Sequence, residues 1–301
     1  IGVIGGVRQK MHVFFMDLPH SDAPFIKAYP AETTEAFLDG HVSAFAFFAS
    51  RSQTGQSGVP QSILYDNTKL AVARILGDGT RARTQAFTGL VSHYLFRDRF
   101  GRPGKGNDKG KVEGLVKNGR RRFLTPVPSA SSYDELNAKL EAHCRQEWER
   151  RAGRHAETIG ERLMSDLAAF RSLPAGTFEA CEKRSARVSS TLQVRYRMND
   201  YSVPMAYGYR DVIVKGFVDE VVILCGAEEI ARHKRSYWYP ELYRRFQVYP
   251  AATTSAGARP ANHRSASDDT LHSAPRSRRQ SFGRDVLIGR RRPENRFPPS
   301  K

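Results

Sequence analysis

The chain reads Ser62-Ile63-Leu64-Tyr65-Asp66-Asn67 near the end of its first quarter, an apolar run that predicts a buried strand ending on the Asp66 carboxylate. A second stretch reads Asn107-Asp108-Lys109-Gly110-Lys111-Val112-Glu113, and it predicts a Gly-rich basic approach into a helix over about residues 109–121. Two carboxylates delivered by different elements among Lys and Arg side chains suit a site that holds a divalent metal against a phosphodiester.

Each of these carboxylates also has an ordinary structural interpretation. Asp-Asn after a strand is common turn chemistry, and a Glu in a basic helix is usually a solvated ion-pair partner. Helical spacing favours the functional interpretation, because Glu113, Lys117 and Arg120 lie at i, i+4 and i+7 and share one face. A carboxylate with two cations on its own face can hold a metal and grip neighbouring phosphates, or it can form a salt-bridged surface.

The overall charge points to a polyanionic partner. The 301 residues carry a formal charge of +17, and 40% of them are hydrophobic, as expected of a folded chain that binds nucleic acid. No run approaches the roughly 18 consecutive apolar residues of a membrane helix. The three cysteines are far apart and show no metal-ligand spacing, which indicates buried or free thiols in a reducing cytoplasm.

The first half of the chain shows the pattern of a mixed α/β domain. Two strands are predicted over residues 11–16 and 24–29, joined as a hairpin, and a helix follows over about residues 34–48. Its aromatic side chains and His41 share one face and are interpreted as core. A further helix is predicted between residues 84 and 96, and a Gly-rich basic loop covers residues 97–111.

The second half changes character twice. Ser132 and Glu135 form a capping box that opens a helix to about residue 151, and a shorter helix covers about residues 159–171. Closely spaced alternating strands between residues 186 and 233, the first over 188–194, predict a small barrel. Residues 251–301 are rich in Ala, Ser, Arg and Pro without hydrophobic periodicity, and disorder is the expectation there.

These residues resemble a retroviral-integrase-type catalytic core and, more closely, the IstA-like transposases of bacterial insertion sequences. The similarity covers about residues 3–237. It is carried, in order, by His12-Val13-Phe14-Phe15-Met16-Asp17, Ser21, Phe25-Ile26, Thr34-Glu35-Ala36, Tyr65-Asp66-Asn67, Asn107, Lys109-Gly110, Val112-Glu113 and Lys117.

The resemblance implies an RNase H-like fold and a triad of Asp, Asp and Glu that binds two Mg²⁺ (or Mn²⁺) ions for DNA integration and recombination. Asp66 matches the second carboxylate and Glu113 the third, so both are expected to be catalytic metal ligands. Lys109, Lys117 and Arg120 are expected to contact DNA. The family works with a separate helper ATPase, and a homo-oligomer on transposon-end and target DNA is expected.

The sequence departs from the family pattern in three places. The first Asp of the triad belongs to a strand expected upstream of Ile1, since Asp17 matches the second strand, where the Asp is not a ligand. Residues 49–57 look like an insertion between helix and strand. After about Tyr237 the resemblance stops, which suggests a truncated or frame-shifted element, with an ordinary basic tail as the alternative.

The resulting prediction is an α/β chain with four parts. They are a partial RNase H-like integrase core at 1–127, a helical connector at 128–185, a small β-barrel at 186–237 and a divergent basic tail at 238–301. The predicted function is metal-dependent transposition in a bacterial cytoplasm, at the nucleoid, with little activity because one ligand is absent. A non-catalytic DNA-binding or interaction module is the alternative, and a general basic nucleic-acid-binding protein is the third.

Overall fold

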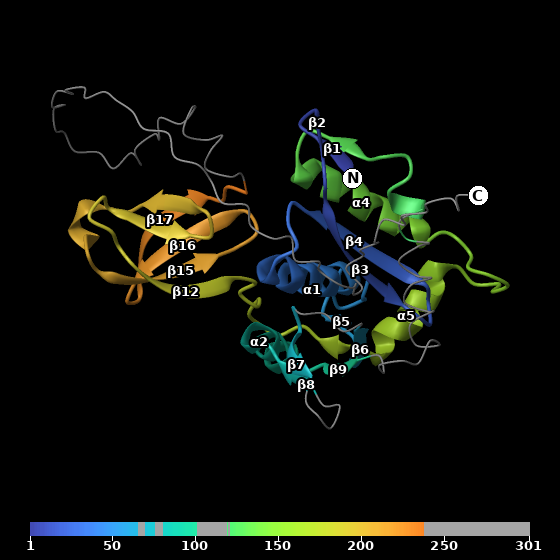
Figure 1. Cartoon of the computed structure of the whole chain (residues 1–301). Coiled ribbons are helices and arrows are strands. Elements are labelled where there is room, and N and C mark those ends of the chain that lie inside the picture. Colours follow the sequence, from blue (N-terminus) through green and yellow to red (C-terminus); the bar gives the residue numbers. More distant parts are fainter. Residues whose placement is uncertain (66–69, 76–80, 101–118, 120, 238–301) are drawn as a thin grey trace, which may run out of the picture. The chain divides into compact units, whose positions relative to one another are not determined.

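The computed structural model describes residues 1–65, 70–75, 81–100, 119 and 121–237 (Figure 1). Chain contacts divide the molecule into two units, and all of the described residues belong to the unit that contains Ile1–Tyr237. None of the helices in these described ranges is long and apolar enough to cross a membrane. The described elements mix helices and strands, which confirms the α/β prediction.

The N-terminal strands form two ladders. Strand β1 (Gly2–Ile4) pairs antiparallel with β2 (Val7–Gln9) and parallel with β10 (Ser129–Ala130). Strands β3 (His12–Leu18) and β4 (Ala23–Tyr29) form the predicted hairpin, with His12 opposite Tyr29 and Leu18 opposite Ala23. Both are buried along nearly their whole length, because helices pack against them.

Helix α1 (Thr34–Ala49) packs on both strands of this hairpin (Figure 1). The hydroxyl of Thr33 caps it by accepting a hydrogen bond from the Ala36 amide, which satisfies one of the free donors of its first turn. Phe37, Phe45 and Phe48 are at most 1% exposed, so the predicted aromatic face is core.

Short strands and a second helix follow α1. They are β5 (Ser57–Val59), β6 (Ser62–Tyr65), β7 (Val72–Ile75), β8 (Arg81–Arg83), α2 (Gln85–Tyr94) and β9 (Arg97–Phe100). Strand β6 runs parallel to β9, and β7 pairs antiparallel with β8. Gly58 lets β5 lie directly on α1, since a Cβ there would come within 2.3 Å of the Phe45 carbonyl oxygen.

Two capped helices form the connector. Helix α4 (Tyr133–Glu147) begins at Ser132 and α5 (Ile159–Ala169) at Thr158, and β11 (Arg171–Ser172) then pairs with β5. The capping box was assigned to the wrong helix. The Glu135 carboxylate accepts from the Ser131 amide rather than from Ser132, whereas Thr158 and Glu161 make both reciprocal bonds.

The last described region has its own β core. Strands β12 (Glu182–Arg187), β15 (Asp211–Gly216), β16 (Glu220–Cys225) and β17 (Glu228–Lys234) form an antiparallel sheet in that order. Strands β13 (Gln193–Tyr196) and β14 (Asn199–Ser202) form a hairpin, and the 3-10 turn η1 (Met205–Tyr207) follows. Nine side chains, among them Val194, Val214 and Ile223, make up the core between them.

Two predictions for this region were wrong. Within the described residues the strands do not close into a barrel, because β13 and β14 hydrogen-bond to each other and not to the four-stranded sheet. The strand predicted over residues 188–194 is interrupted by a turn, in which the Leu192 amide donates to the Ser189 carbonyl and Leu192 has a φ of 58°.

The RNase H-like order of strands stays a prediction. Within the described ranges β3–β4 and β6–β9 are two separate two-stranded ladders, so they do not define the order of a single central sheet. Residues 238–301, predicted to be a disordered tail, lie outside the described residues.

Candidate functional site

The residues predicted to carry chemistry all fall outside the described ranges. These are Asp66, Lys109, Glu113, Lys117 and Arg120. The described structure shows the segments that flank them. Strand β6 ends at Tyr65, one residue before Asp66, as the sequence predicted.

The segment that carries Glu113 returns to the core at Gly119. A Cβ at Gly119 would lie 2.7 Å from the Phe15 ring, so a larger residue there would require the ring to move. Phe123 then packs edge-on against Phe15, with ring centroids 6.5 Å apart. Tyr65, just before Asp66, and Phe123, which follows the stretch that carries Glu113 in the sequence, belong to the same large hydrophobic core.

A buried polar pair holds the end of β6. The Tyr65 hydroxyl lies 2.8 Å from His41 Nε2, and His41 Nδ1 lies 2.8 Å from the Phe37 carbonyl oxygen. Burial lowers the pKa of His41 to about 4, so the ring is neutral at pH 7. The Nδ1–H group then donates to the Phe37 carbonyl, and Nε2 accepts from Tyr65. The pair fixes the backbone from which Asp66 follows.

Asp17, the aspartate that the resemblance assigned no catalytic role, has a perturbed acidity. Burial and then the Asp22 carboxylate together raise the pKa of Asp17 to about 7, against the partly opposing effect of the Arg122 guanidinium. Asp166, on α5, adds to the rise, and its Oδ2 atom is buried without a hydrogen bond. In the described part of the chain no three His, Cys, Asp or Glu side chains are arranged to hold a metal.

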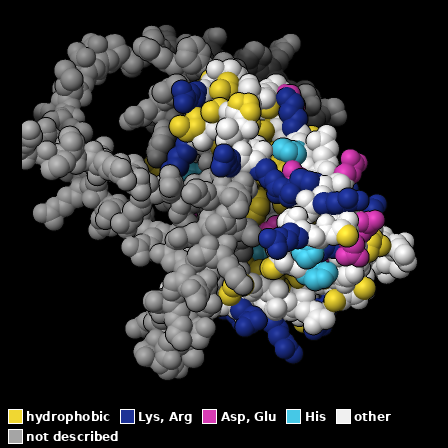
Figure 2. All heavy atoms as spheres, turned by 90° about the vertical axis from the view of Figure 1, so that its right-hand side faces the viewer, with side chains coloured by type: hydrophobic (Ala, Val, Ile, Leu, Met, Phe, Trp, Pro, Cys, Tyr) yellow, Lys and Arg dark blue, Asp and Glu magenta, His cyan; other side chains and the backbone are white. Residues whose placement is uncertain are grey.

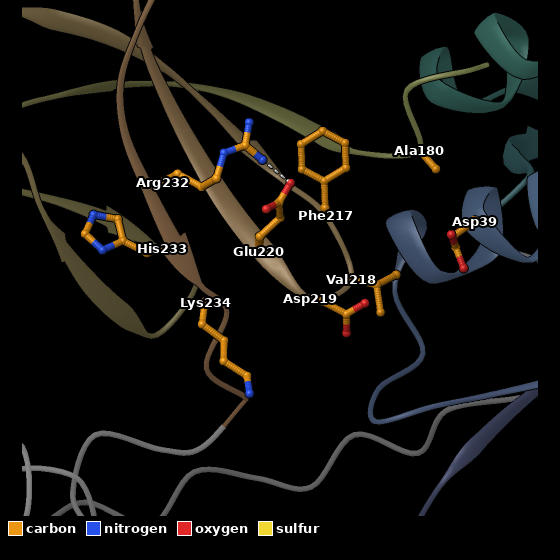
Figure 3. Close-up of a pocket in the computed structure, with 9 residues that line it drawn as sticks. All are labelled: Asp39, Ala180, Phe217, Val218, Asp219, Glu220, Arg232, His233 and Lys234. Atoms are coloured by element: carbon orange, nitrogen blue, oxygen red, sulfur yellow. Dashed lines mark hydrogen bonds and ion pairs between the residues drawn. The ribbon is translucent and has the colours of Figure 1, made fainter. Parts of the chain in front are cut away.

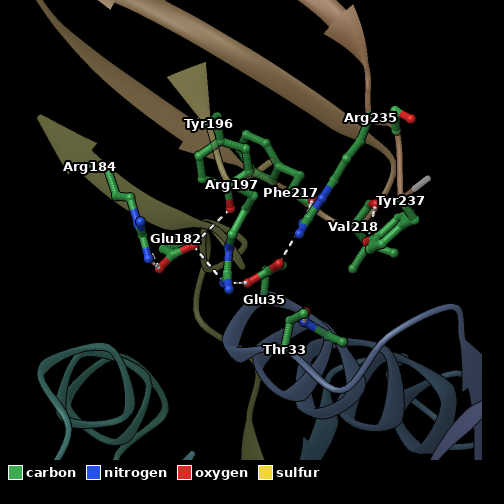
Figure 4. Close-up of polar contacts among 12 residues, drawn as sticks. Thr33, Glu35, Glu182, Arg184, Tyr196, Arg197, Phe217, Val218, Arg235 and Tyr237 are labelled. Atoms are coloured by element: carbon green, nitrogen blue, oxygen red, sulfur yellow. Dashed lines mark hydrogen bonds and ion pairs between the residues drawn. The ribbon is translucent and has the colours of Figure 1, made fainter. Parts of the chain in front are cut away.

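A buried ion-pair cluster joins α1 to the C-terminal β region (Figure 4). Glu35, in the first turn of α1, is 0% exposed, and its Oε1 lies 2.5 Å from Arg235 Nη1. Its Oε2 lies 3.6 Å from Arg197 Nη2, which in turn contacts Glu182 at 2.7 Å. The Tyr196 hydroxyl donates to the same oxygen of this carboxylate, Glu182 Oε2, at 2.8 Å.

Arg235 is the most enclosed cation of this cluster. Its side chain is 4% exposed, and its guanidinium carbon lies 4.5 Å from the centre of the Tyr237 ring and 5.4 Å from that of Tyr196. It also donates to the Phe217 carbonyl. Ring faces and a carboxylate together compensate a charge that has lost its water. The sequence named Glu35 only within the Thr34-Glu35-Ala36 match to the family, and it did not single out Arg197 or Arg235.

An open cavity of about 590 Å³ lies beside this cluster (Figure 3). Its charges are largely paired with one another. Arg232 contacts Glu220, and the Asp39 carboxylate accepts from the Tyr29 hydroxyl at 2.6 Å and from Lys27 Nζ at 2.7 Å. Two of the three lining carboxylates, Glu220 and Asp39, therefore already have cationic or hydroxyl partners, and burial raises the pKa of the third, Asp219.

Basic side chains are spread over the described surface that Figure 2 presents, with fewer acidic ones between them. Such a surface suits a polyanionic partner. The three cysteines, Cys144, Cys181 and Cys225, are free, as predicted from their spacing.

Comparison with known proteins consistently finds transposases. Residues 173–239 match the family described as "Mu transposase, C-terminal domain". The chain is 32% identical over 235 residues to the transposase for insertion sequences IS1326/IS1353 of Pseudomonas aeruginosa, covering 78% of this chain and 45% of that protein. A transposase of Aminobacter aminovorans is 31% identical, covering 77% of this chain and 44% of the relative.

A third relative defines the group further. The transposase for insertion sequence element IS21 of Pseudomonas aeruginosa is 27% identical over 233 residues, covering 77% of this chain and 57% of the relative. Over about three quarters of its length the chain is similar to insertion-sequence transposases, as the resemblance indicated. It spans about half the length of these relatives.

Proposed function

We propose that this chain is the catalytic and C-terminal part of a transposase that cuts and joins DNA at the ends of an insertion sequence. The observation that carries the proposal is the 32% identity over 235 residues to a transposase of insertion sequences. The match of residues 173–239 to a Mu transposase C-terminal domain also supports it. The excess of basic side chains suits the DNA substrate.

Asp66 and Glu113 are the proposed metal ligands. Carboxylate oxygens are the ligands that Mg²⁺ prefers, and Mg²⁺ supplies activation of the attacking oxygen and stabilisation of the leaving oxygen in phosphodiester chemistry. The hydrogen bond between Tyr65 and His41, at the end of β6 and one residue before Asp66, supports the assignment of Asp66. An RNase H-like core is the fold that we propose around them.

The proposed partners are the transposon ends, the target DNA, a helper ATPase and further copies of the same chain. Lys109, Lys117 and Arg120 are the proposed DNA contacts beside Glu113. A transposase works where its substrate lies, so we place it at the bacterial nucleoid in the cytoplasm.

A non-catalytic DNA-binding module is the second candidate. The charge of +17 favours it independently of any catalytic group, since phosphate binding needs only cations. The two candidates differ in what Asp66 and Glu113 do. In a binding module, neutralising either carboxylate leaves every DNA-dependent property in place.

The test is Mg²⁺- or Mn²⁺-dependent nicking of a labelled duplex that carries the insertion-sequence end. We would compare the 301-residue chain with a form extended upstream, each with and without Glu113→Gln. The proposal predicts that at least one of the two forms nicks the duplex. It also predicts that Glu113→Gln abolishes nicking in that form. DNA binding without nicking in both forms would contradict catalysis and support the binding module.

A further inference from the structure

The β6–β9 ladder presents arginines on its outer face. Strand β9 alternates, so Arg97 and Arg99 are exposed while Asp98 and Phe100 are partly buried. The register pairs Ser62 with Arg97 and Leu64 with Arg99. Ser62 and Leu64 are exposed as well, so the two arginines stand on a face without a covering layer in the described part of the chain.

A third arginine, Arg83, is held near Arg97 and Arg99 by the Asp98 carboxylate. Asp98, whose side chain is 4% exposed, accepts from Arg83 Nε at 2.7 Å and also from Arg83 Nη2. This two-bond pairing fixes the plane of the guanidinium group. Arg83 itself, on β8, stays 40% exposed in its side chain. Its remaining donors are therefore oriented before any ligand arrives.

The three arginines line two adjoining hollows. One, of about 540 Å³, is lined by Ser62, Arg83, Phe96, Arg97, Asp98 and Arg99. The other, of about 430 Å³, is lined by Arg83, Thr88, Asp98 and Phe100. Arg83 and Asp98 line both hollows, and we call the two together the arginine groove. Among the described residues its charged lining is three cations and one anion.

The groove lies beside the strand end that precedes Asp66, the predicted catalytic carboxylate. Tyr65 and Phe100 are paired in the ladder, and Asp66 is the next residue after Tyr65. The groove therefore begins beside the strand end from which Asp66 follows. An open groove with three separate guanidinium groups suits a chain of phosphates better than a single small anion, because each group can bind a different phosphate.

We propose that the arginine groove binds successive backbone phosphates of the DNA strand that is cut, through Arg83, Arg97 and Arg99. This assignment rests on the proposed function and adds a site for its substrate. Arg97 and Arg99 contact the phosphates from the open face, and Asp98 keeps Arg83 oriented toward them. The contacts are to the backbone, so the groove positions DNA and does not select its sequence.

The test is DNA binding by the 301-residue chain, measured by fluorescence anisotropy with a labelled insertion-sequence end over a series of salt concentrations. The variant is Arg97→Gln with Arg99→Gln. The matched control is Arg154→Gln with Arg171→Gln, two exposed arginines that line neither hollow. Circular dichroism would confirm that both variants fold.

The groove predicts about tenfold weaker binding in the first variant, and a plot of log affinity against log salt whose slope is shallower by about two. The control is expected to lose less than about twofold. Equal losses in the two variants would show that net charge alone matters and would overturn the groove. A wild-type chain that does not bind the duplex would contradict the proposed function as well.

Chemical footprinting gives a second readout that needs no variant. Phenylglyoxal modifies exposed arginines, and mass spectrometry locates the adducts. With bound DNA, modification of Arg97 and Arg99 is expected to fall severalfold while that of Arg154 is unchanged. Unchanged modification of Arg97 and Arg99 in a chain that demonstrably binds the duplex would overturn the groove and leave the proposed function intact.

Discussion

The large N-terminal core and the small C-terminal β core differ in where they place polar groups. The large core contains Phe37, Phe45, Phe48 and Phe87 at most 1% exposed, and it encloses the neutral His41 among them. The small core consists mainly of valine and tyrosine, without a buried ionisable group of this kind. Its charged contact lies at its border, where Arg235 meets Glu35.

The difference teaches what each polar group does. His41 makes both of its hydrogen bonds inside one core and fixes a strand there. Glu35 has its charge compensated by arginines from the other region, so it joins two cores that each have their own hydrophobic packing. Substitutions at the two residues should therefore act on different properties, and they give ways to test the comparison.

Removal of Glu35 is expected to have the largest effect. Glu35→Ala leaves the Arg235 side chain, 4% exposed, without its closest counter-charge. Breaking a buried pair in this way costs about 3–5 kcal/mol. Urea unfolding would measure the loss, with the exposed Glu149→Ala as the control, expected within about 0.5 kcal/mol of wild type.

Combining Glu35→Ala with Arg235→Met sharpens this prediction. Removing both charges also removes the uncompensated cation, so the double variant should be more stable than Glu35→Ala alone. If Glu35→Ala cost less than about 1 kcal/mol, the pair would behave as a surface ion pair and the joint between the cores would not depend on it.

Asp17 is expected to give the next largest effect, as a pH dependence. The pKa of Asp17 in the folded protein, about 7, lies above its ordinary value of 3.8. The contribution of Asp17 to the free energy of unfolding is therefore present below about pH 4 and is lost as the pH rises toward 7. The loss is about 3–4 kcal/mol at 1.36 kcal/mol per pKa unit, allowing for partial exposure. Asp17→Asn should remove it, measured as unfolding free energy against pH.

The titration of His41 changes stability with pH in the opposite direction. Its folded pKa of about 4 lies below the ordinary value of 6.5, so stability falls as the pH drops from 6.5 toward 4, by about 3 kcal/mol. In the wild type the opposite effects of Asp17 and His41 on the pH dependence of stability nearly cancel. We therefore expect stability that rises with pH in Asp17→Asn and falls with pH in His41→Gln. Parallel curves for the two variants between pH 4 and 6.5 would contradict these assignments.

The smallest effect is expected at an exposed ion pair of the C-terminal region. Arg195 contacts Asp200 at 3.0 Å, with 68% and 41% of their side chains exposed. Such pairs contribute about 0–1 kcal/mol, so Arg195→Ala should be close to neutral in urea unfolding. A loss as large as that of Glu35→Ala would mean that burial does not distinguish the two pairs.

Local patterns in the sequence predicted local structure well. The aromatic spacing placed a helix over residues 34–48, and the structure shows Thr34–Ala49 with His41 inside. Strand β6 and its end at Tyr65 were also predicted. The cap at Ser132 was half right, while the Thr158-x-x-Glu161 signal for a complete capping box was present in the sequence and was missed.

Features that depend on contacts between residues far apart in the sequence were not predictable from local patterns. Nothing beside Glu35 in the sequence indicates Arg235, because the two meet only through the tertiary fold. The closed barrel failed for the same reason, since alternation identifies strands and does not say which strands pair. For the candidate site, the sequence and its resemblance are the source of Asp66 and Glu113, which lie outside the described residues.

The central claim is that Asp66 and Glu113 hold a divalent metal, and the most direct test is Mn²⁺ binding followed by electron paramagnetic resonance in the presence of duplex DNA. Wild type and Asp17→Asn are expected to show the same saturable binding. Asp66→Asn and Glu113→Gln are each expected to bind Mn²⁺ at least about tenfold more weakly. Equal Mn²⁺ affinity in all four proteins would contradict the claim and leave a DNA-binding chain without a metal site at these residues.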